Sequence, residues 1–154
     1  MTASLTAIYA HRPVDDRLGT SGQPTVAQLG AIAEAGYTTV INLGLHDDKR
    51  YALPDEAGTV AALGMRYVHI PVQFGAPTRS DLKAFFDAMD AARSERVWVH
   101  CAANMRVSAF LGLYWALRDG QEHERAFALM HELWKRQPNE VWPAFIADAL
   151  AWPP

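Results

Sequence analysis

The chain has 154 residues, 50% of them hydrophobic and 20% charged, with a formal net charge of −3 and a single cysteine. This composition is typical of a globular protein with one core, and the mild acidity predicts no nucleic-acid or membrane partner. A single cysteine excludes an internal disulfide and fits a reducing compartment. Residues 1–12 lack the pattern of a signal peptide or a transmembrane span, so we expect a cytoplasmic protein.

The predicted elements alternate between short strands and helices. Apolar runs rich in β-branched residues predict the strands, and apolar residues at helical spacing predict the helices. In chain order we expect strands at 4–9 and 17–20, a turn at 21–24, a helix at 25–35, a strand at 37–43, a loop at 44–54, a helix at 55–63, a strand at 66–72, a helix at 78–92, a strand at 97–100, and helices at 108–119, 122–134 and 139–151. This order predicts a single α/β domain spanning residues 1–154, with a mostly parallel central sheet of about 4–5 strands and helices on both faces.

Two threonines are expected to begin helices. Thr25 is a typical N-cap, and Gly36 is expected to end the helix that Thr25 opens. Thr78 is followed three residues later by Asp81, which resembles a capping box with Asp in place of Glu. These local signals set the expected helix boundaries.

Cys101 directly follows the predicted strand 97–100. A loop of small residues that contains Arg106 comes next, and a helix is expected from about Ser108. The N–H groups and the dipole at a helix start favour bound anions, and the same field favours the thiolate form of Cys101. In parallel sheets, ligands bind beyond the carboxyl ends of the strands, which is where Cys101 lies. A thiolate beside a bound oxyanion indicates covalent catalysis on phosphorus or sulfur.

This segment resembles the signature loop of the protein tyrosine and dual-specificity phosphatases. The matching residues are Trp98-Val99-His100-Cys101, with Arg106 and Ser108 after them. Supporting matches are the turn Ser21-Gly22-Gln23-Pro24 and the strands Val40–Leu43 and Tyr67–Val72, so the resemblance covers most of residues 18–117. More narrowly, the chain resembles a bacterial phosphatase-like family of poorly defined function known as beta-lactamase hydrolase-like.

The resemblance implies a dual-specificity-phosphatase-like fold and hydrolysis of a phosphate monoester without a metal or other cofactor. It implies that Cys101 is the nucleophile and forms a cysteinyl-phosphate, while the planar fork of Arg106 binds the phosphoryl oxygens. Ser108 would help the sulfur leave in the second step, and His100 would order the loop. The other loop residues would bind phosphate: Ala102, Ala103, Asn104, Met105 and Val107. The implied partner is a phosphorylated small molecule or a phosphoprotein.

The chain departs from the phosphatase pattern at two positions. The family signature places Arg six residues after Cys, whereas Arg106 stands five after Cys101 and Ser108 stands where the hydroxyl is expected. Asn104 falls where the family has glycine, and Asn tolerates a positive φ. In the loop after strand 66–72, Gln73 occupies the position of the general-acid Asp. Glutamine cannot donate a proton in this way, so no general acid is evident.

Two other functions fit the same loop. A catalytically weak phosphatase-fold module that binds phosphate or another anion is favoured by Gln73 and by the early arginine. The spacing also fits a rhodanese-like sulfurtransferase with a persulfide on Cys101, because rhodanese loops often place Arg five residues after Cys. We expect no metal, since the His46-Asp47-Asp48 run is typical of a solvated loop. Four tryptophans in the C-terminal third are expected to line a cleft or a homodimer contact: Trp115, Trp134, Trp142 and Trp152.

Overall fold

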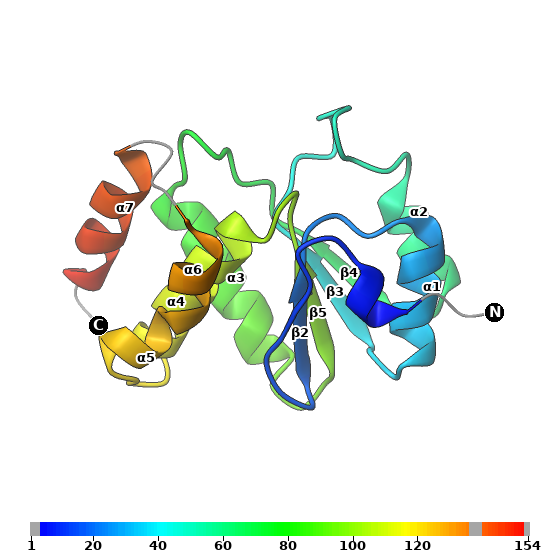
Figure 1. The fold of residues 1–154 in the computed structure, drawn as a ribbon, viewed down its shortest axis with the longest axis horizontal. Coiled ribbons are helices and arrows are strands. Elements are labelled where there is room, and N and C mark those ends of the chain that lie inside the picture. Colours follow the sequence, from blue (N-terminus) through cyan, green and yellow to red (C-terminus); the bar gives the residue numbers. More distant parts are fainter. Residues whose placement is uncertain (1–3, 136–139, 153–154) are drawn as a thin grey trace.

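The computed structural model describes residues 4–135 and 140–152 and contains a central five-stranded sheet in the order β1-β2-β5-β3-β4 (Figure 1). The strands are β1 (Arg12–Pro13), β2 (Leu18–Ser21), β3 (Thr39–Asn42), β4 (Arg66–His69) and β5 (Val97–His100). β2, β5, β3 and β4 are parallel, and β1 pairs antiparallel with β2. The predicted α/β fold with a mostly parallel sheet is therefore confirmed.

Helices cover both faces of the sheet, as predicted. The described helices are η1 (Leu5–Ala7), α1 (Val26–Glu34), α2 (Glu56–Ala62), α3 (Arg79–Ala91), α4 (Met105–Leu117), α5 (His123–Ala126), α6 (Ala128–Leu133) and α7 (Val141–Leu150). Figure 1 shows α1 and α2 on one face and α3 to α7 on the other. In the described ranges, no helix is long and apolar enough to span a membrane.

The two faces of β5 contribute to two separate cores, because successive strand residues point in opposite directions. Trp98 packs with Leu29 and Ile32 of α1, whereas Val99 packs with Phe110 of α4 in the larger cluster. All five side chains are at most 1% exposed. Burial on both faces explains why this strand is an almost continuous apolar run.

The local capping signals are confirmed. The side chain of Thr25 accepts from the N–H of Gln28, and that of Thr78 accepts from the N–H of Asp81. Both caps are reciprocal capping boxes. Gly36 follows α1 with φ +97°, a conformation that favours glycine.

The prediction of a strand at 4–9 is wrong. Leu5–Ala7 forms a 3-10 turn, with the N–H groups of Ala7 and Ile8 bonded to Ser4 and Leu5. Leu5 and Ile8 pack in the smaller core, and their spacing of three fits a helical turn rather than a strand. The strand that pairs with β2 is instead Arg12–Pro13.

Two helix predictions in the second half also need correction. α4 begins at Met105, three residues before the expected start, so Arg106 and Ser108 both lie in its first turn. The single helix expected at 122–134 is divided into α5 and α6 at Phe127, whose φ is −100° and ψ is 11°. The ring of Phe127 lies directly against Gly112 of α4, where a Cβ atom would collide with it. This close packing fixes the break. The start predicted at Asn139 for the last helix lies outside the described residues.

Candidate active site

Cys101 lies at the carboxyl end of β5, between β2 and β3, with no exposed surface. It lines a cavity of about 450 Å³ together with other residues of its loop and of two neighbouring loops. The lining residues from its own loop and α4 are Ala102, Ala103, Met105 and Arg106. Those from the neighbouring loops are Leu45, Asp48, Arg50, Tyr51, Gln73, Phe74 and Gly75. The predicted nucleophile and the predicted anion-binding arginine therefore share one cavity.

The backbone of this loop offers hydrogen-bond donors. Within residues 4–135 and 140–152, the N–H groups of residues 102–107 have no hydrogen-bond acceptor. They include the first N–H groups of α4, a 13-residue helix whose dipole adds positive potential at this end. Unpaired N–H groups beside a cavity suit an anion with several oxygens.

Asn104 shapes the loop from behind the cavity. It is the N-cap of α4 with φ +64°, the left-handed conformation that the sequence anticipated. Its side-chain amide donates to Ala10 O at 3.0 Å and to Thr20 Oγ1 at 2.9 Å. The side chain therefore ties the loop to β2, and any contribution of Asn104 to phosphate binding would come from its backbone.

Arg106 is almost completely buried, with 5% of its surface exposed. Nη1 donates to Val72 O at 2.8 Å, and Nη2 donates to the hydroxyl of Tyr51 at 3.5 Å. A guanidinium has five N–H donors, so three remain after these two bonds. Among the described residues, no carboxylate lies within salt-bridge distance of Arg106. Tyr51 escaped the sequence analysis because no local pattern links it to the loop.

Ser108 and Val107 face the protein interior. The Ser108 hydroxyl donates to Met105 O at 3.0 Å and accepts from Trp134 Nε1 at 3.1 Å. Val107 has no exposed surface and packs in the larger core. The structure places neither side chain in the lining of the Cys101 cavity. The assistance of Ser108 to the sulfur stays a prediction, and it requires the hydroxyl to exchange a partner.

His100 has a carboxylate partner that the sequence did not reveal. Its Nε2 lies 2.7 Å from Glu56 Oε2, and both side chains are buried. Burial raises the pKa of Glu56, but the hydrogen bonds from His100, Gln23 and Tyr67 together lower it below its usual value. Glu56 is 44 positions away from His100. Only the tertiary packing of the chain brings the two together, because Glu56 begins α2 and His100 ends β5.

The turn Ser21-Gly22-Gln23-Pro24 packs directly against the cysteine loop. Gln23 N–H donates to Ala102 O at 3.0 Å, and Ser21 Oγ accepts from Trp98 Nε1 at 2.9 Å. Gly22 lies so close to the loop that a Cβ atom would fall 2.7 Å from the Tyr9 ring and nearer still to Ala102 O. Glycine is needed here for close approach of the two backbones.

Gly22→Ala is expected to lower the free energy of unfolding by about 1–3 kcal/mol, because the new methyl group overlaps the Ala102 carbonyl. Urea unfolding followed by tryptophan fluorescence measures this effect. Gly30→Ala is the matched control. It replaces a glycine within α1, and the added Cβ atom meets nothing within 4 Å. The control should be neutral or stabilising by up to about 1 kcal/mol. Equal stability of Gly22→Ala and the parent would contradict the steric argument.

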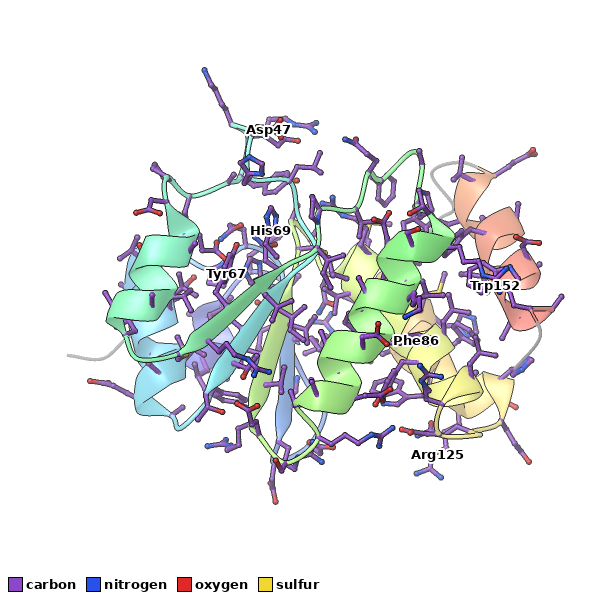
Figure 2. All side chains as sticks on the ribbon, turned by 180° about the vertical axis from the view of Figure 1, so that it is seen from behind. Asp47, Tyr67, His69, Phe86, Arg125 and Trp152 are labelled. Atoms are coloured by element: carbon purple, nitrogen blue, oxygen red, sulfur yellow. The ribbon has the colours of Figure 1, made fainter. Side chains whose placement is uncertain are left out.

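None of the nearby carboxylates is placed as a proton donor. Asp48 lines the cavity, but the Arg50 guanidinium that it binds lowers the pKa of its carboxyl to about 2. Asp55 caps α2 by accepting from Gly58 N–H, and Figure 2 shows Asp47 at the outer end of the 44–54 loop. Gln73 lines the cavity where an acid was expected. The described residues around this cavity therefore show no carboxyl group in the position of a general acid.

Two histidines, His46 and His69, lie close together outside the lining of the Cys101 cavity. His69 Nε2 bonds to Gly44 O at 2.7 Å, and its ring meets that of His46 edge to face. The described ranges contain no group of three or more His, Cys, Asp or Glu residues placed to hold a metal ion.

Comparisons with known proteins place this site in a family context. A family model described as "DSP-PTPase phosphatase fused to NAD+ Kinase" matches residues 9–140. A beta-lactamase hydrolase-like protein from Xylella fastidiosa (strain Temecula1) is 28% identical over 120 residues, covering 77% of this chain and 28% of the relative. Another from Agrobacterium fabrum (strain C58) is 31% identical over 96 residues, covering 60% and 22%. The chain thus spans less than a third of the length of these curated relatives.

Solved structures show the same fold. A candidate phosphatase of the DUF442 group from Shewanella putrefaciens CN-32 is 34% identical, with a TM-score of 0.84 and coverage of 96% of this chain and 95% of that one. Tk-PTP in its active form has a TM-score of 0.75 at 16% identity, covering 91% and 95%, and supports the fold alone. Because the family model covers most of the chain, the protein belongs to the DSP-PTPase family of phosphatases.

Proposed function

We propose that this protein hydrolyses phosphate monoesters through a cysteinyl-phosphate on Cys101. The observation that carries the proposal is Arg106, a cation with 5% exposure and no salt bridge to a carboxylate among the described residues. Asp48 acts on it electrostatically, but the Asp48 carboxylate is paired with Arg50. A buried charge without a salt bridge is costly, and a dianionic phosphate in the adjoining cavity would neutralise it. The unpaired N–H groups of residues 102–107 add donors for the remaining oxygens.

The reaction proceeds in two displacements at phosphorus. The Cys101 thiolate attacks, an Sγ–P bond forms, and the P–O bond to the leaving group breaks with its electron pair on oxygen. Water then attacks the same phosphorus, the Sγ–P bond breaks, and its electron pair returns to sulfur. Inorganic phosphate leaves and one proton passes to solvent. Arg106 and the loop N–H groups stabilise the charge on the phosphoryl oxygens in both steps.

The lining of the cavity favours substrates with good leaving groups. Gln73 cannot protonate the departing oxygen, and Asp48 is ionised because Arg50 holds its pKa near 2. The leaving group must therefore depart as an anion or take a proton from water. We propose aryl phosphates and other esters of acidic alcohols as better substrates than alkyl phosphates, on either a small molecule or a protein.

The direct test measures turnover and the intermediate together. The parent protein is incubated with p-nitrophenyl phosphate, p-nitrophenol release is followed, and acid-quenched samples are examined by intact mass. We expect turnover and a fraction of protein carrying one added phosphoryl group at Cys101. Phosphate binding without turnover or adduct would instead support the anion-binding module that Gln73 favours. Absence of both binding and turnover would overturn the proposed function.

Gln73→Asp is expected to raise kcat for alkyl phosphates by about 10²-fold, because a carboxyl group at this position can protonate the leaving oxygen. The gain should be much smaller for p-nitrophenyl phosphate, whose leaving group needs no proton. A series of phosphates with graded leaving-group acidity measures the change in slope. Gln73→Asn is the matched control, since it shortens the side chain without adding an acid. An equal gain for every leaving group would contradict a general-acid role at this position.

A further inference from the structure

A second polar cavity of about 480 Å³ lies on the β3–β4 side of the 44–54 loop. Its lining includes Glu56, Tyr67 and His69, and the last two lie on β4, which ends at His69 (Figure 2). Glu56 connects this cavity to the cysteine loop, because it is bonded to His100, the residue immediately before Cys101. The Glu56 carboxylate is therefore in contact with the loop that is proposed to bind phosphate.

Both ring nitrogens of His100 face hydrogen-bond acceptors. Nε2 lies 2.7 Å from Glu56 Oε2, and Nδ1 lies 3.3 Å from Cys101 O. A backbone carbonyl can only accept, so Nδ1 must carry a proton to make its bond. A neutral imidazole has one N–H, so the proton on the other side belongs either to Nε2 or to Glu56. The pair is thus an imidazolium with a carboxylate, or a neutral imidazole with a carboxylic acid.

The surroundings of Glu56 favour the carboxylate. Gln23 Nε2 donates to Oε1 at 2.6 Å, and Tyr67 also hydrogen-bonds to the carboxyl group. Burial raises the pKa of Glu56, but the hydrogen bond and the charge of His100, with smaller contributions from Gln23 and Tyr67, lower it below its usual value. Burial raises the pKa of Tyr67, which keeps it a neutral phenol. Both carboxyl oxygens of Glu56 face N–H groups, and Nδ1 of His100 faces a carbonyl oxygen, so these contacts fit an ion pair between Glu56 and His100.

The Cys101 carbonyl decides where the next N–H group points. In a trans peptide the C=O of one residue and the N–H of the next point in opposite directions, and the chain contains no cis bond among its described residues. A carbonyl of Cys101 held by His100 therefore orients the N–H of Ala102 away from His100. The carbonyl of Ala102 is held in the same manner by Gln23 N–H at 3.0 Å, which orients the N–H of Ala103.

We propose that Glu56 is a positioning residue that holds His100 as an imidazolium, and through the Cys101 carbonyl orients the loop N–H groups for phosphate. Gln23 supports the same arrangement twice, since its side chain holds Glu56 and its N–H holds Ala102. The inference rests on the proposed function, because it takes the cysteine loop as the phosphate site. It assigns a role to the Ser21-to-Pro24 turn and to a carboxylate outside the catalytic cavity.

Other titratable groups lie near Glu56 and near Cys101, the residues at the two ends of the Glu56–His100–Cys101 contacts. His46, Asp55, Tyr67 and His69 line the cavity beside Glu56. Asp48, Arg50, Tyr51 and Arg106 line the cavity beside Cys101. Asp55 is the useful comparison, because it neighbours Glu56 and lines the same cavity while its carboxylate bonds to Gly58 N–H instead of His100.

The test compares Glu56→Gln with the parent and with Asp55→Asn, which removes the same charge and retains an N-cap side chain. Nitrogen NMR of the histidine rings reports the protonation of His100, and calorimetry with inorganic phosphate reports binding. In the parent we expect both His100 nitrogens to be protonated near neutral pH. In Glu56→Gln we expect one of the two protons to be lost and phosphate affinity to fall about tenfold. Asp55→Asn should match the parent in both measurements.

The outcomes separate this inference from the proposed function. A parent protein with one unprotonated His100 nitrogen overturns the inference, and this measurement needs no variant to fold. A Glu56→Gln variant with the same phosphate affinity as the parent also overturns the inference. A parent that shows the protonated ring and the Glu56-dependent phosphate binding but never turns over p-nitrophenyl phosphate supports the inference and refutes the proposed hydrolysis.

Discussion

Replacing Cys101 with serine is expected to lower kcat for p-nitrophenyl phosphate by at least about 10³-fold. A serine hydroxyl is not ionised at neutral pH, and Asp48, the carboxylate in the described lining of the cavity, is too weak a base to remove its proton because Arg50 lowers its pKa to about 2. The covalent route is therefore lost, while the loop N–H groups and Arg106 are retained. Initial rates and the acid-quenched mass of the variant measure both consequences.

The control for Cys101→Ser is binding rather than turnover. Because the anion site is intact, inorganic phosphate should still raise the Tm of the variant. Any ligand that binds only the folded state has this effect. Cys101 is the only cysteine, so alkylation of the parent reports on this one thiol, and phosphate should protect it. Parental turnover by Cys101→Ser would exclude a cysteinyl-phosphate.

Replacing Arg106 with lysine is expected to lower kcat/KM by about 10²-fold, and replacing it with alanine by about 10³-fold. Lysine keeps a positive charge but cannot contact two phosphoryl oxygens in the plane of a fork. It also cannot reproduce the paired contacts to Val72 O and the Tyr51 hydroxyl. Steady-state kinetics with p-nitrophenyl phosphate, together with the Kd for inorganic phosphate, measure the loss.

Arg50→Lys and Arg50→Ala are the matched controls for Arg106. Arg50 lines the same cavity, but its side chain is 86% exposed and paired with Asp48. Its charge is screened by solvent, so we expect changes in kcat/KM of less than about fivefold. A larger loss of kcat/KM in the Arg50 variants than in the Arg106 variants would indicate that phosphate binds to the 44–54 loop instead. Arg106→Lys with parental kinetics would contradict the assignment.

The early position of Arg106 relative to the phosphatase signature has a structural counterpart. α4 begins at Met105, directly after the left-handed Asn104, so the arginine occupies the second position of the helix. Its guanidinium contacts Val72 O, at the start of the loop that carries Gln73. The arginine therefore reaches the cavity from a helical turn and is held by the neighbouring loop.

The sequence by itself determined the α/β class, the capped starts of α1 and α3, and the position of Cys101 at a strand end. These features depend on residues close in the chain, such as the Thr25 and Thr78 capping boxes and the continuous buried run of β5. Such interactions leave a local pattern of residue types. The same kind of local pattern was wrong for residues 4–9, where a strand was expected and a 3-10 turn is found.

Only the tertiary structure decided the partners of the site residues. His100 meets Glu56, Ser108 meets Trp134, and Arg106 meets Val72 O and Tyr51 through contacts between segments far apart in the chain. The break at Phe127 has the same origin, since it follows from contact with Gly112. A buried polar group takes whichever partner the packing brings within reach, and that choice leaves no periodic signal in the sequence. The location of Cys101 can therefore be predicted from the local sequence. The charges and hydrogen bonds that surround it depend on the tertiary structure.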